Sequence, residues 1–415
     1  MHLGTASLPL VFASLLLPSL AIAAPPAKPH LLQRPALTKT QIVFNYAGDL
    51  WTVDRSGGKA NRLTVGVGIE TSPIVSPDGQ TVAFSGEYDG NADVFTIPIS
   101  GGVPKRVTYH PAVDVPVAWS PDGSKIVFRS NRDAASRFTQ LYEVAASGGP
   151  AKLMPLPMGY TGDISPDGKY IAYEPIALPF GFNYSTYVAW GNYHGGQAGT
   201  INVTNLADLT TVTIPHEKTS DFAPVWLNGK VYFLSNRKGA TEIFSYDPAS
   251  KAVTEVLHNS GPDLHSLAGG RGGLVYDQLG EIYIFDPATK QSHMVAINVD
   301  SDLPEVREHI ESVSDQILHA GISATGLRAV FEAHGEILTV PAKKGPTRDI
   351  TNTPGVMERD PAWSPDGQSI AYFSDESGLY AVHVANQTNG GAVKKFALAQ
   401  EPAYYFHPRW SPDSI

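Results

Sequence analysis

The sequence predicts an all-β protein, with a six-bladed β-propeller followed by the first blades of a second, incomplete propeller. A four-residue turn, Ser-Pro-Asp-Gly, recurs along the chain at nearly regular intervals. Short stretches of alternating apolar and polar residues follow each copy, as expected for antiparallel strands. The 39 glycines and 33 prolines are also too many for a helical bundle.

The recurring turn sets the length of the repeat. Copies begin at Ser76, Ser120, Ser165 and Ser364, and Ser411 begins a fifth copy in which serine replaces the glycine. Adjacent copies are 44, 45 and 47 residues apart, which is the length of four short strands with their turns. Proline favours a type I turn, aspartate accepts backbone hydrogen bonds, and glycine adopts positive φ. We therefore interpret the tetrapeptide as a turn, not as a set of metal ligands or acids.

Degenerate copies near Thr38, Leu227, Gly270 and Ser323 bring the number of predicted units to nine. Closed propellers usually contain about four to eight blades, so nine units are better divided between two domains. The interval between turns lengthens near residues 300–315, and six units precede this division while three follow it. Because a blade buries both faces only against neighbours, three blades cannot close a ring, and we expect the chain to end inside its second domain.

This division gives the expected domain order. Residues 1–23 are a signal peptide, 24–34 a linker, 35–300 the six-bladed propeller, 301–315 a second linker and 316–415 the partial second propeller.

The first residues have the pattern of an export signal. The run from Leu8 to Ala24 is almost free of polar residues and ends in a small-x-small sequence, which predicts cleavage between Ala23 and Ala24. We therefore expect an exported, periplasmic protein. A membrane anchor is the alternative, but the run is short and interrupted by Pro18. No later segment approaches about 20 apolar residues, so we expect no membrane contact after cleavage.

Composition and motifs exclude several functional classes. The formal charge of −10 makes nucleic acid an unfavourable partner. The absence of cysteine excludes disulfides, thiolate zinc sites and cysteine nucleophiles. No Gly-x-Ser-x-Gly or His-Glu-x-x-His sequence occurs. We therefore expect no catalytic residue, no metal site and no cofactor in this chain.

Two groups of residues are candidates for substrate binding. Arg129, Arg132 and Arg137 follow one another near the end of a predicted inner strand, and a guanidinium can hold a carboxylate by two hydrogen bonds. The alternative is that these arginines are exposed and pair with nearby acidic residues, Asp133 or Glu143.

The second group lies in the long interval after Ser165, where aromatic residues alternate with glycines. Tyr184 and Trp190 could contact a peptide from this inserted loop. Packing of the loop against the next blade is the alternative interpretation.

Beyond the repeated turn, the chain carries a series of local motifs in a defined order. They are Gly48-Asp49-Leu50-Trp51, Gly86-Glu87-Tyr88-Asp89-Gly90-Asn91, Phe233-Leu234-Ser235-Asn236-Arg237, Glu332-Ala333-His334-Gly335-Glu336-Ile337 with Lys344-Gly345-Pro346, and Thr353-Pro354-Gly355-Val356 with Arg359. As an ordered set, covering nearly all of residues 35–415, they resemble the N-terminal propellers of bacterial tricorn protease homologues.

The resemblance implies a six-bladed propeller followed by a seven-bladed one, then a PDZ domain and a catalytic domain with a serine nucleophile. It also implies that the propellers form the wall and channels of a chamber, with peptides or unfolded polypeptide as partners and a homo-oligomer formed by the full-length protein. The catalytic residues of that family lie after these propellers, so none is assigned here. That family is usually described as cytoplasmic, in contrast to the export signal.

The leading interpretation is a non-catalytic propeller region that gates and docks peptides for a downstream serine peptidase. A periplasmic protein-binding scaffold of the TolB type is the first alternative, since TolB-like propellers share the Ser-Pro-Asp-Gly turn. The propeller part of an amidohydrolase is the second.

Overall fold

The computed structural model is all-β in the residues that it describes, as predicted. These are residues 31–133, 138–176, 198–216, 218–270, 272–300, 303, 310, 312–353, 355–388, 390–400 and 403–413. The predicted cleavage site at Ala23 and Ala24 lies outside them, as do Arg137, Tyr184 and Trp190. Within the described ranges, no helix is both long enough and apolar enough to cross a membrane.

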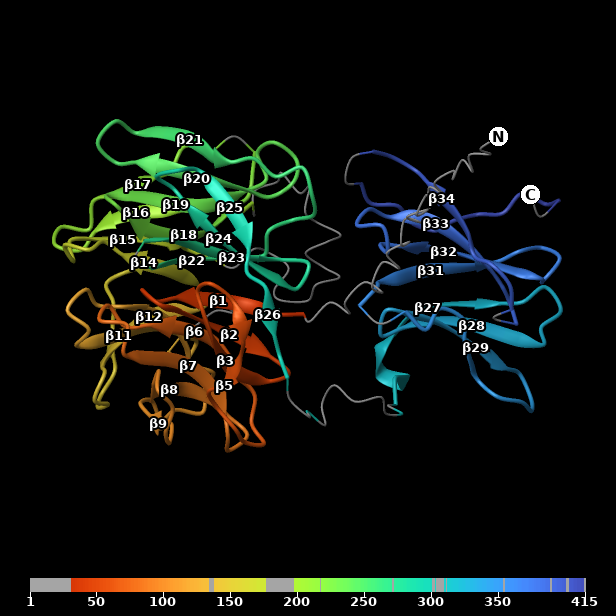
Figure 1. Cartoon of the computed structure of the whole chain (residues 1–415), viewed down its shortest axis with the longest axis horizontal. Helices are drawn as coiled ribbons and strands as arrows, with labels where there is room; N and C mark the ends of the chain where they lie inside the picture. The colour runs from red at the N-terminus through yellow and green to blue at the C-terminus, as the bar shows by residue number, and fades with distance from the viewer. Residues whose placement is uncertain are drawn as a thin grey trace, which may run out of the picture.

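The first part of the chain forms six four-stranded antiparallel sheets, each a meander of consecutive short strands (Figure 1). In order along the chain they are β1 (Gln33–Leu37), β2 (Gln41–Tyr46), β3 (Asp49–Asp54) and β5 (Asn61–Arg62); β6 (Glu70–Val75), β7 (Thr81–Glu87), β8 (Ala92–Pro98) and β9 (Lys105–Arg106); β10 (Val115–Trp119), β11 (Lys125–Ser130), β12 (Gln140–Ala145) and β13 (Lys152–Leu153); β14 (Thr161–Ile164), β15 (Tyr170–Glu174), β16 (Asn202–Asn205) and β17 (Thr211–Thr213); β18 (Asp221–Leu227), β19 (Lys230–Ser235), β20 (Glu242–Asp247) and β21 (Ala252–Leu257); β22 (Ser266–Gly270), β23 (Gly273–Gln278), β24 (Glu281–Asp286) and β25 (Gln291–Met294).

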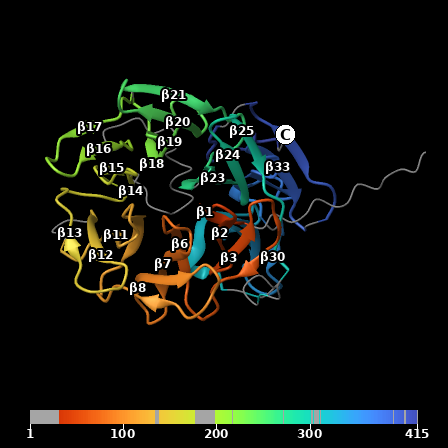
Figure 2. The ribbon, with the colours of Figure 1, turned by 60° about the vertical axis from the view of Figure 1, so that its left-hand side comes forward.

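The six sheets form a ring. The first strand of each sheet packs against the first strand of the next, and β22 of the last sheet returns to pack against β1 of the first (Figure 2). A two-stranded parallel pair also joins the ends, because β26 (Ile297–Asn298) pairs with β4 (Gly58–Lys59). The amide of Gly58 donates to the carbonyl oxygen of Ala296 over 2.8 Å at this junction. Residues separated by more than 200 positions are therefore held together.

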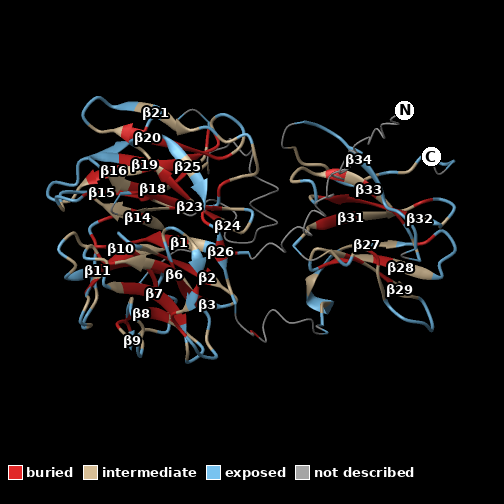
Figure 3. Ribbon diagram, viewed as in Figure 1, coloured by how far each residue is buried: buried red, intermediate tan, exposed pale blue. Residues whose placement is uncertain are grey.

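The apolar core lies between neighbouring sheets. Phe44 of the first sheet packs with Val275 and Ile284 of the sixth, while Val43 on the opposite face packs with Phe84 of the second. Buried residues concentrate along the middle of the strands in Figure 3. Because adjacent residues of a strand point to opposite faces, each sheet buries one row of side chains against each neighbour.

The repeated tetrapeptide forms the turn that its composition predicts. In the second sheet the amide of Gly79 donates to the carbonyl of Ser76 over 2.8 Å, and Gly79 has φ +78°. Asp78 accepts hydrogen bonds from the Ser76 hydroxyl and the Gln80 amide. In the next copy, hydrogen bonds from Ser120 and Ser124 lower the pKa of Asp122 to about 2.

The second part of the chain contains two more four-stranded antiparallel sheets of the same type. A single turn of 3-10 helix, η2 (Ser314–Gln316), precedes them. Their strands are β27 (Ile317–Ile322), β28 (Arg328–Ala333), β29 (Glu336–Pro341) and β30 (Arg348–Asp349); β31 (Glu358–Trp363), β32 (Ser369–Ser374), β33 (Ala381–Asn386) and β34 (Lys394–Ala397). The unit predicted at Ser411 is represented by residues 403–413, which contain no strand.

Candidate functional site

A large cavity of the described structure lies inside the ring. It has a volume of about 1130 Å³ and is lined by residues of all six first strands, β1, β6, β10, β14, β18 and β22. Binding pockets for small molecules usually have volumes of about 300–1,000 Å³. The cavity therefore has room for a ligand larger than a typical metabolite, and the six inner strands decide what that ligand contacts.

Several inner strands place one residue in the cavity wall through a β-bulge with a positive φ angle. Arg34, Ser72 and Ala223 have φ values of 48°, 55° and 52°, and each lies where the strand register shifts by a bulge. All three line the cavity. A bulge re-aims a side chain relative to the regular pleat. Here the residues from the first and second sheets meet, because Arg34 Nη1 donates to Ser72 Oγ over 2.7 Å.

Arg129 is the sequence-predicted candidate that lines this cavity. Its Nη1 donates to the carbonyl oxygen of Tyr160 over 3.2 Å, and its guanidinium carbon lies 4.3 Å from the centre of the Tyr160 ring. Burial lowers the pKa of Arg129, with a smaller lowering from the charge of Arg34. Arginine nevertheless stays protonated in proteins, so two cationic groups share the same region of the wall.

Two acidic groups that line the cavity, Glu174 and Asp163, have raised pKa values. Burial raises the pKa of Glu174 to about 8, and its Oε1 accepts a hydrogen bond from the amide of Ala223 over 2.7 Å. Burial also raises the pKa of Asp163 to about 6, although it accepts hydrogen bonds from the amides of Trp226 and Ile164. At pH 7 Glu174 is therefore mostly protonated. The wall around Arg34 and Arg129 carries more positive charge than its composition suggests.

Arg132 lies in a different environment from Arg129 and does not line the cavity. Its Nη2 donates to the fully buried carboxylate of Asp114, and its guanidinium lies 5.0 Å from the Phe128 ring and 5.2 Å from the Tyr142 ring. The fifth sheet repeats this arrangement, with Arg237 bound to Asp221 between Phe233 and Phe244. The contacts of Arg132 are thus those of a repeated structural ion pair.

For Arg129 and Arg132, the two arginines that the structure describes, the partners differ from the Asp133 and Glu143 expected as the alternative. Asp133 accepts a hydrogen bond from the hydroxyl of Tyr142 over 3.1 Å, and Glu143 pairs with Lys125 over 3.0 Å. The other candidates, Arg137, Tyr184 and Trp190, lie outside the described residues.

Sequence reasoning missed Arg34 and Tyr160. A signal for Arg34 exists: it lies four residues before Thr38, which begins the first turn, and Ser72 lies four residues before Ser76. Position relative to the turn therefore identifies side chains that reach the cavity. Tyr160 lies one residue before its inner strand, β14, and has no such signal.

Two groups of side chains in the described part of the chain have the composition of metal ligands. They are His319, Asp360 and His407, and Glu242, Glu255 and His258. In the second group, internal partners already balance the charge: His258 Nδ1 lies 2.6 Å from Glu242, and Lys238 pairs with Glu255.

Comparison with known proteins places the chain in a family. Residues 29–291 match the model of the tricorn protease N-terminal β-propeller domain. Tricorn protease homolog 2 of Streptomyces coelicolor is 26% identical over 381 residues, covering 88% of this chain and 32% of that protein. The tricorn protease homolog of Saccharolobus solfataricus is 25% identical over 346 residues, covering 81% and 31%. The chain thus spans about a third of the length of these curated relatives.

A solved structure supports the same fold. The crystal structure of the tricorn protease aligns with a TM-score of 0.57 and 19% identity, covering 93% of this chain and 46% of that one. The ring of four-stranded sheets and the match over residues 29–291 lead to one conclusion: the chain belongs to the tricorn protease N-terminal β-propeller domain family.

Proposed function

We propose that this chain is the non-catalytic propeller portion of a tricorn-like serine peptidase, and that its ring gates and docks peptide substrates for proteolysis by another region of the protein. The observation that carries the proposal is the cavity lined by six inner strands, with Arg34 and Arg129 in its wall. The names of the relatives and their greater length support the assignment of proteolysis to a longer protein.

The chemistry of the wall suits a peptide terminus. A guanidinium binds a carboxylate through two parallel, charge-assisted hydrogen bonds. Tyr160 orients the guanidinium of Arg129 through a hydrogen bond. The carboxyl group of Glu174 interacts electrostatically with Arg129, and it is mostly protonated at pH 7 because its pKa is about 8. A peptide carboxylate entering the cavity would meet the guanidinium groups of Arg34 and Arg129 in its wall.

The proposal includes a second propeller begun by the two sheets of residues 317–397. The indole Nε1 of Trp410 donates to the carbonyl oxygen of Ala362 over 3.0 Å, just as Trp119 of the first ring donates to Ile74 of the preceding sheet over 3.3 Å. This shared contact between units supports radial stacking in both parts of the chain. Export with cleavage between Ala23 and Ala24 remains part of the proposal.

Peptide binding tests the docking role directly. Fluorescent unstructured peptides, each with a free or an amidated C-terminus, would be titrated with the purified chain and followed by anisotropy. We expect the free carboxylate to bind at least about tenfold more tightly, and Arg129→Met to abolish that difference, since a hydrogen bond to a charged group contributes about 1.5–3 kcal/mol. Lys125→Met is the matched control, because Lys125 lies on the same strand but outside the cavity.

Equal binding of free and amidated peptides would contradict docking by the arginines. The same purified sample should show no peptide hydrolysis. Turnover that copurifies with the chain would contradict the assignment of the chemistry to another region.

A further inference from the structure

Three side chains of the second part of the chain occupy the same position in consecutive units. His319, Asp360 and His407 each lie four residues before the serine that begins a turn, at Ser323, Ser364 and Ser411. This is the position of Arg34 and Ser72 in the first ring, where side chains from neighbouring sheets meet. Asp360 and His407 also have positive φ angles, of 52° and 50°. Stacking of the units therefore brings residues about 40 positions apart in sequence together.

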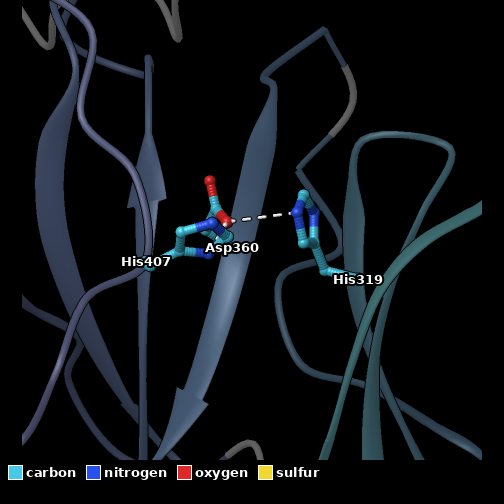
Figure 4. A group of neighbouring side chains, drawn as sticks. All are labelled: His319, Asp360 and His407. Carbon is cyan, nitrogen blue, oxygen red and sulfur yellow. Dashed lines mark ion pairs between the residues drawn. The ribbon is translucent and has the colours of Figure 1, made fainter.

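The three side chains converge on one carboxylate oxygen (Figure 4). His319 Nε2 lies 3.4 Å and His407 Nδ1 lies 3.3 Å from Asp360 Oδ1. Asp360 is only 3% exposed, and Oδ1 has no hydrogen-bond partner in the described structure. A buried carboxylate oxygen without a hydrogen bond costs free energy unless a cation satisfies it.

The two distances fit a shared metal ion better than direct hydrogen bonds. Hydrogen bonds from a charged imidazole to a carboxylate are usually about 2.7–2.9 Å long. Two ligands of a tetrahedral zinc ion, each about 2.0–2.1 Å from the metal, lie about 3.3–3.4 Å apart. The observed separations of 3.3 and 3.4 Å match the edges of such a tetrahedron.

Glu332 orients the ring of His319. Glu332 Oε2 lies 2.7 Å from His319 Nδ1, and Nε2 of the same ring faces Asp360 Oδ1. A carboxylate that accepts from the other ring nitrogen is also the usual partner of a zinc-binding histidine.

Arg359 fixes the remaining oxygen of Asp360. Its Nη2 donates to Asp360 Oδ2 over 3.1 Å, and the guanidinium lies over the rings of Tyr380, Tyr404 and Phe406. Asp360 can therefore offer only Oδ1 to a metal. A site with three protein ligands leaves a fourth tetrahedral position open to water or to a ligand group.

We infer that His319, Asp360 and His407 form a binding site for a divalent transition-metal ion of the zinc type, held by His319 Nε2, Asp360 Oδ1 and His407 Nδ1. The ion links β27, β31 and residues 403–413, the innermost segments of three consecutive units. This site revises the expectation, drawn from sequence, that the chain holds no metal. It is independent of the peptide-docking cavity, because the two lie in different parts of the chain.

The test uses the full chain without an affinity tag, freed of metal with a chelator. We expect isothermal titration with Zn²⁺ to show one tight site per chain, and Co²⁺ to give the intense visible bands of tetrahedral coordination. His407→Ala should weaken Zn²⁺ binding at least about a hundredfold, since loss of even an outer-shell partner costs 10–100-fold. The His407 side chain is 66% exposed, so this variant should fold, and circular dichroism checks that it does.

Two matched controls keep the result specific. His334→Ala removes an exposed histidine from the turn between β28 and β29, and His258→Ala disrupts the other acidic and histidine group. Both should bind Zn²⁺ as the unaltered chain does. The inference is overturned if the unaltered chain binds no Zn²⁺, if His407→Ala binds it unchanged, or if only His258→Ala abolishes binding.

Discussion

Trp410 donates its indole Nε1–H to the carbonyl oxygen of Ala362 across 3.0 Å, and this contact joins two successive units of the second part of the chain. Trp119 makes the equivalent bond to Ile74 in the first ring. In both cases the tryptophan immediately precedes the serine of a turn, and the acceptor lies two residues before the serine of the preceding turn. The inner strands are thus tied together by hydrogen bonds as well as by apolar packing.

The bond made by Trp119 should contribute measurably to stability. Trp119→Phe removes the donor and leaves the Ile74 carbonyl without it, so we expect a loss of about 1 kcal/mol in the free energy of unfolding measured with urea. Trp226→Phe is the control, because the buried Nε1 of Trp226 has no acceptor in the described structure. That control should lose less. Equal losses would show that ring volume, not the hydrogen bond, matters at this position.

Arg132 and Arg129 should respond differently to the same substitution. Arg132→Met leaves the fully buried Asp114 carboxylate without its cation, and we expect a destabilisation of about 3 kcal/mol in thermal or urea unfolding. Arg129→Met removes the hydrogen bond to the Tyr160 carbonyl oxygen and a guanidinium from the cavity wall, so we expect it to affect peptide binding more than stability. A stable Arg132→Met variant that had lost peptide binding would instead place Arg132 in the binding surface.

The junction that closes the ring favours glycine at position 57. Gly57 has φ +86°, and a Cβ atom there would overlap the carbonyl oxygen of Ala296, next to the strand pair that joins the ends of the ring. Gly101 occupies the corresponding turn of the second unit with φ +91° and open space around it. Both alanine variants incur the backbone cost of about 1 kcal/mol. Gly57→Ala should lose about 1–3 kcal/mol more in unfolding experiments.

An equal effect of Gly57→Ala and Gly101→Ala would mean that the β4–β26 junction adapts without cost. Hydrogen exchange at the Gly58 amide, which bonds Ala296, offers a local check. We expect its protection to fall in Gly57→Ala and to persist in Gly101→Ala.

Stability should depend on pH through Glu174. Burial raises the pKa of this carboxyl from about 4.5 in the unfolded chain to about 8 in the folded one, so the folded state binds more protons between these values. The free energy of unfolding should therefore fall as pH rises from 4.5 to 8. Glu174→Gln, which cannot ionise, should show a shallower decline in urea unfolding across that range.

Other buried carboxyls, with pKa values raised to about 7 at Glu70 and Glu358, act in the same direction and will leave part of the slope in the variant. The comparison is therefore between the two slopes. Identical slopes would contradict a raised pKa at Glu174.

Much of the architecture could be predicted because it depends on local chemistry. The turn at Ser76 and the meander after it follow from the conformational preferences of proline, aspartate and glycine and from the alternation of apolar residues. The candidate site was predicted only in part. Arg129 lines the cavity, but Arg132, three residues later, forms an ion pair with the buried Asp114. Sequence spacing alone cannot decide which of two nearby arginines faces a buried acid on another strand.

The amino-acid sequence by itself determined the repeat length, the turns, the all-β class and the family resemblance, because each of these depends on residues close together in the chain. Only the tertiary structure decided that β26 pairs with β4, that Arg34 meets Ser72, and that His319, Asp360 and His407 share one carboxylate oxygen. The physical reason is radial stacking: it superposes equivalent positions of successive units, and residues that are about 40 or more positions apart then come within bonding distance.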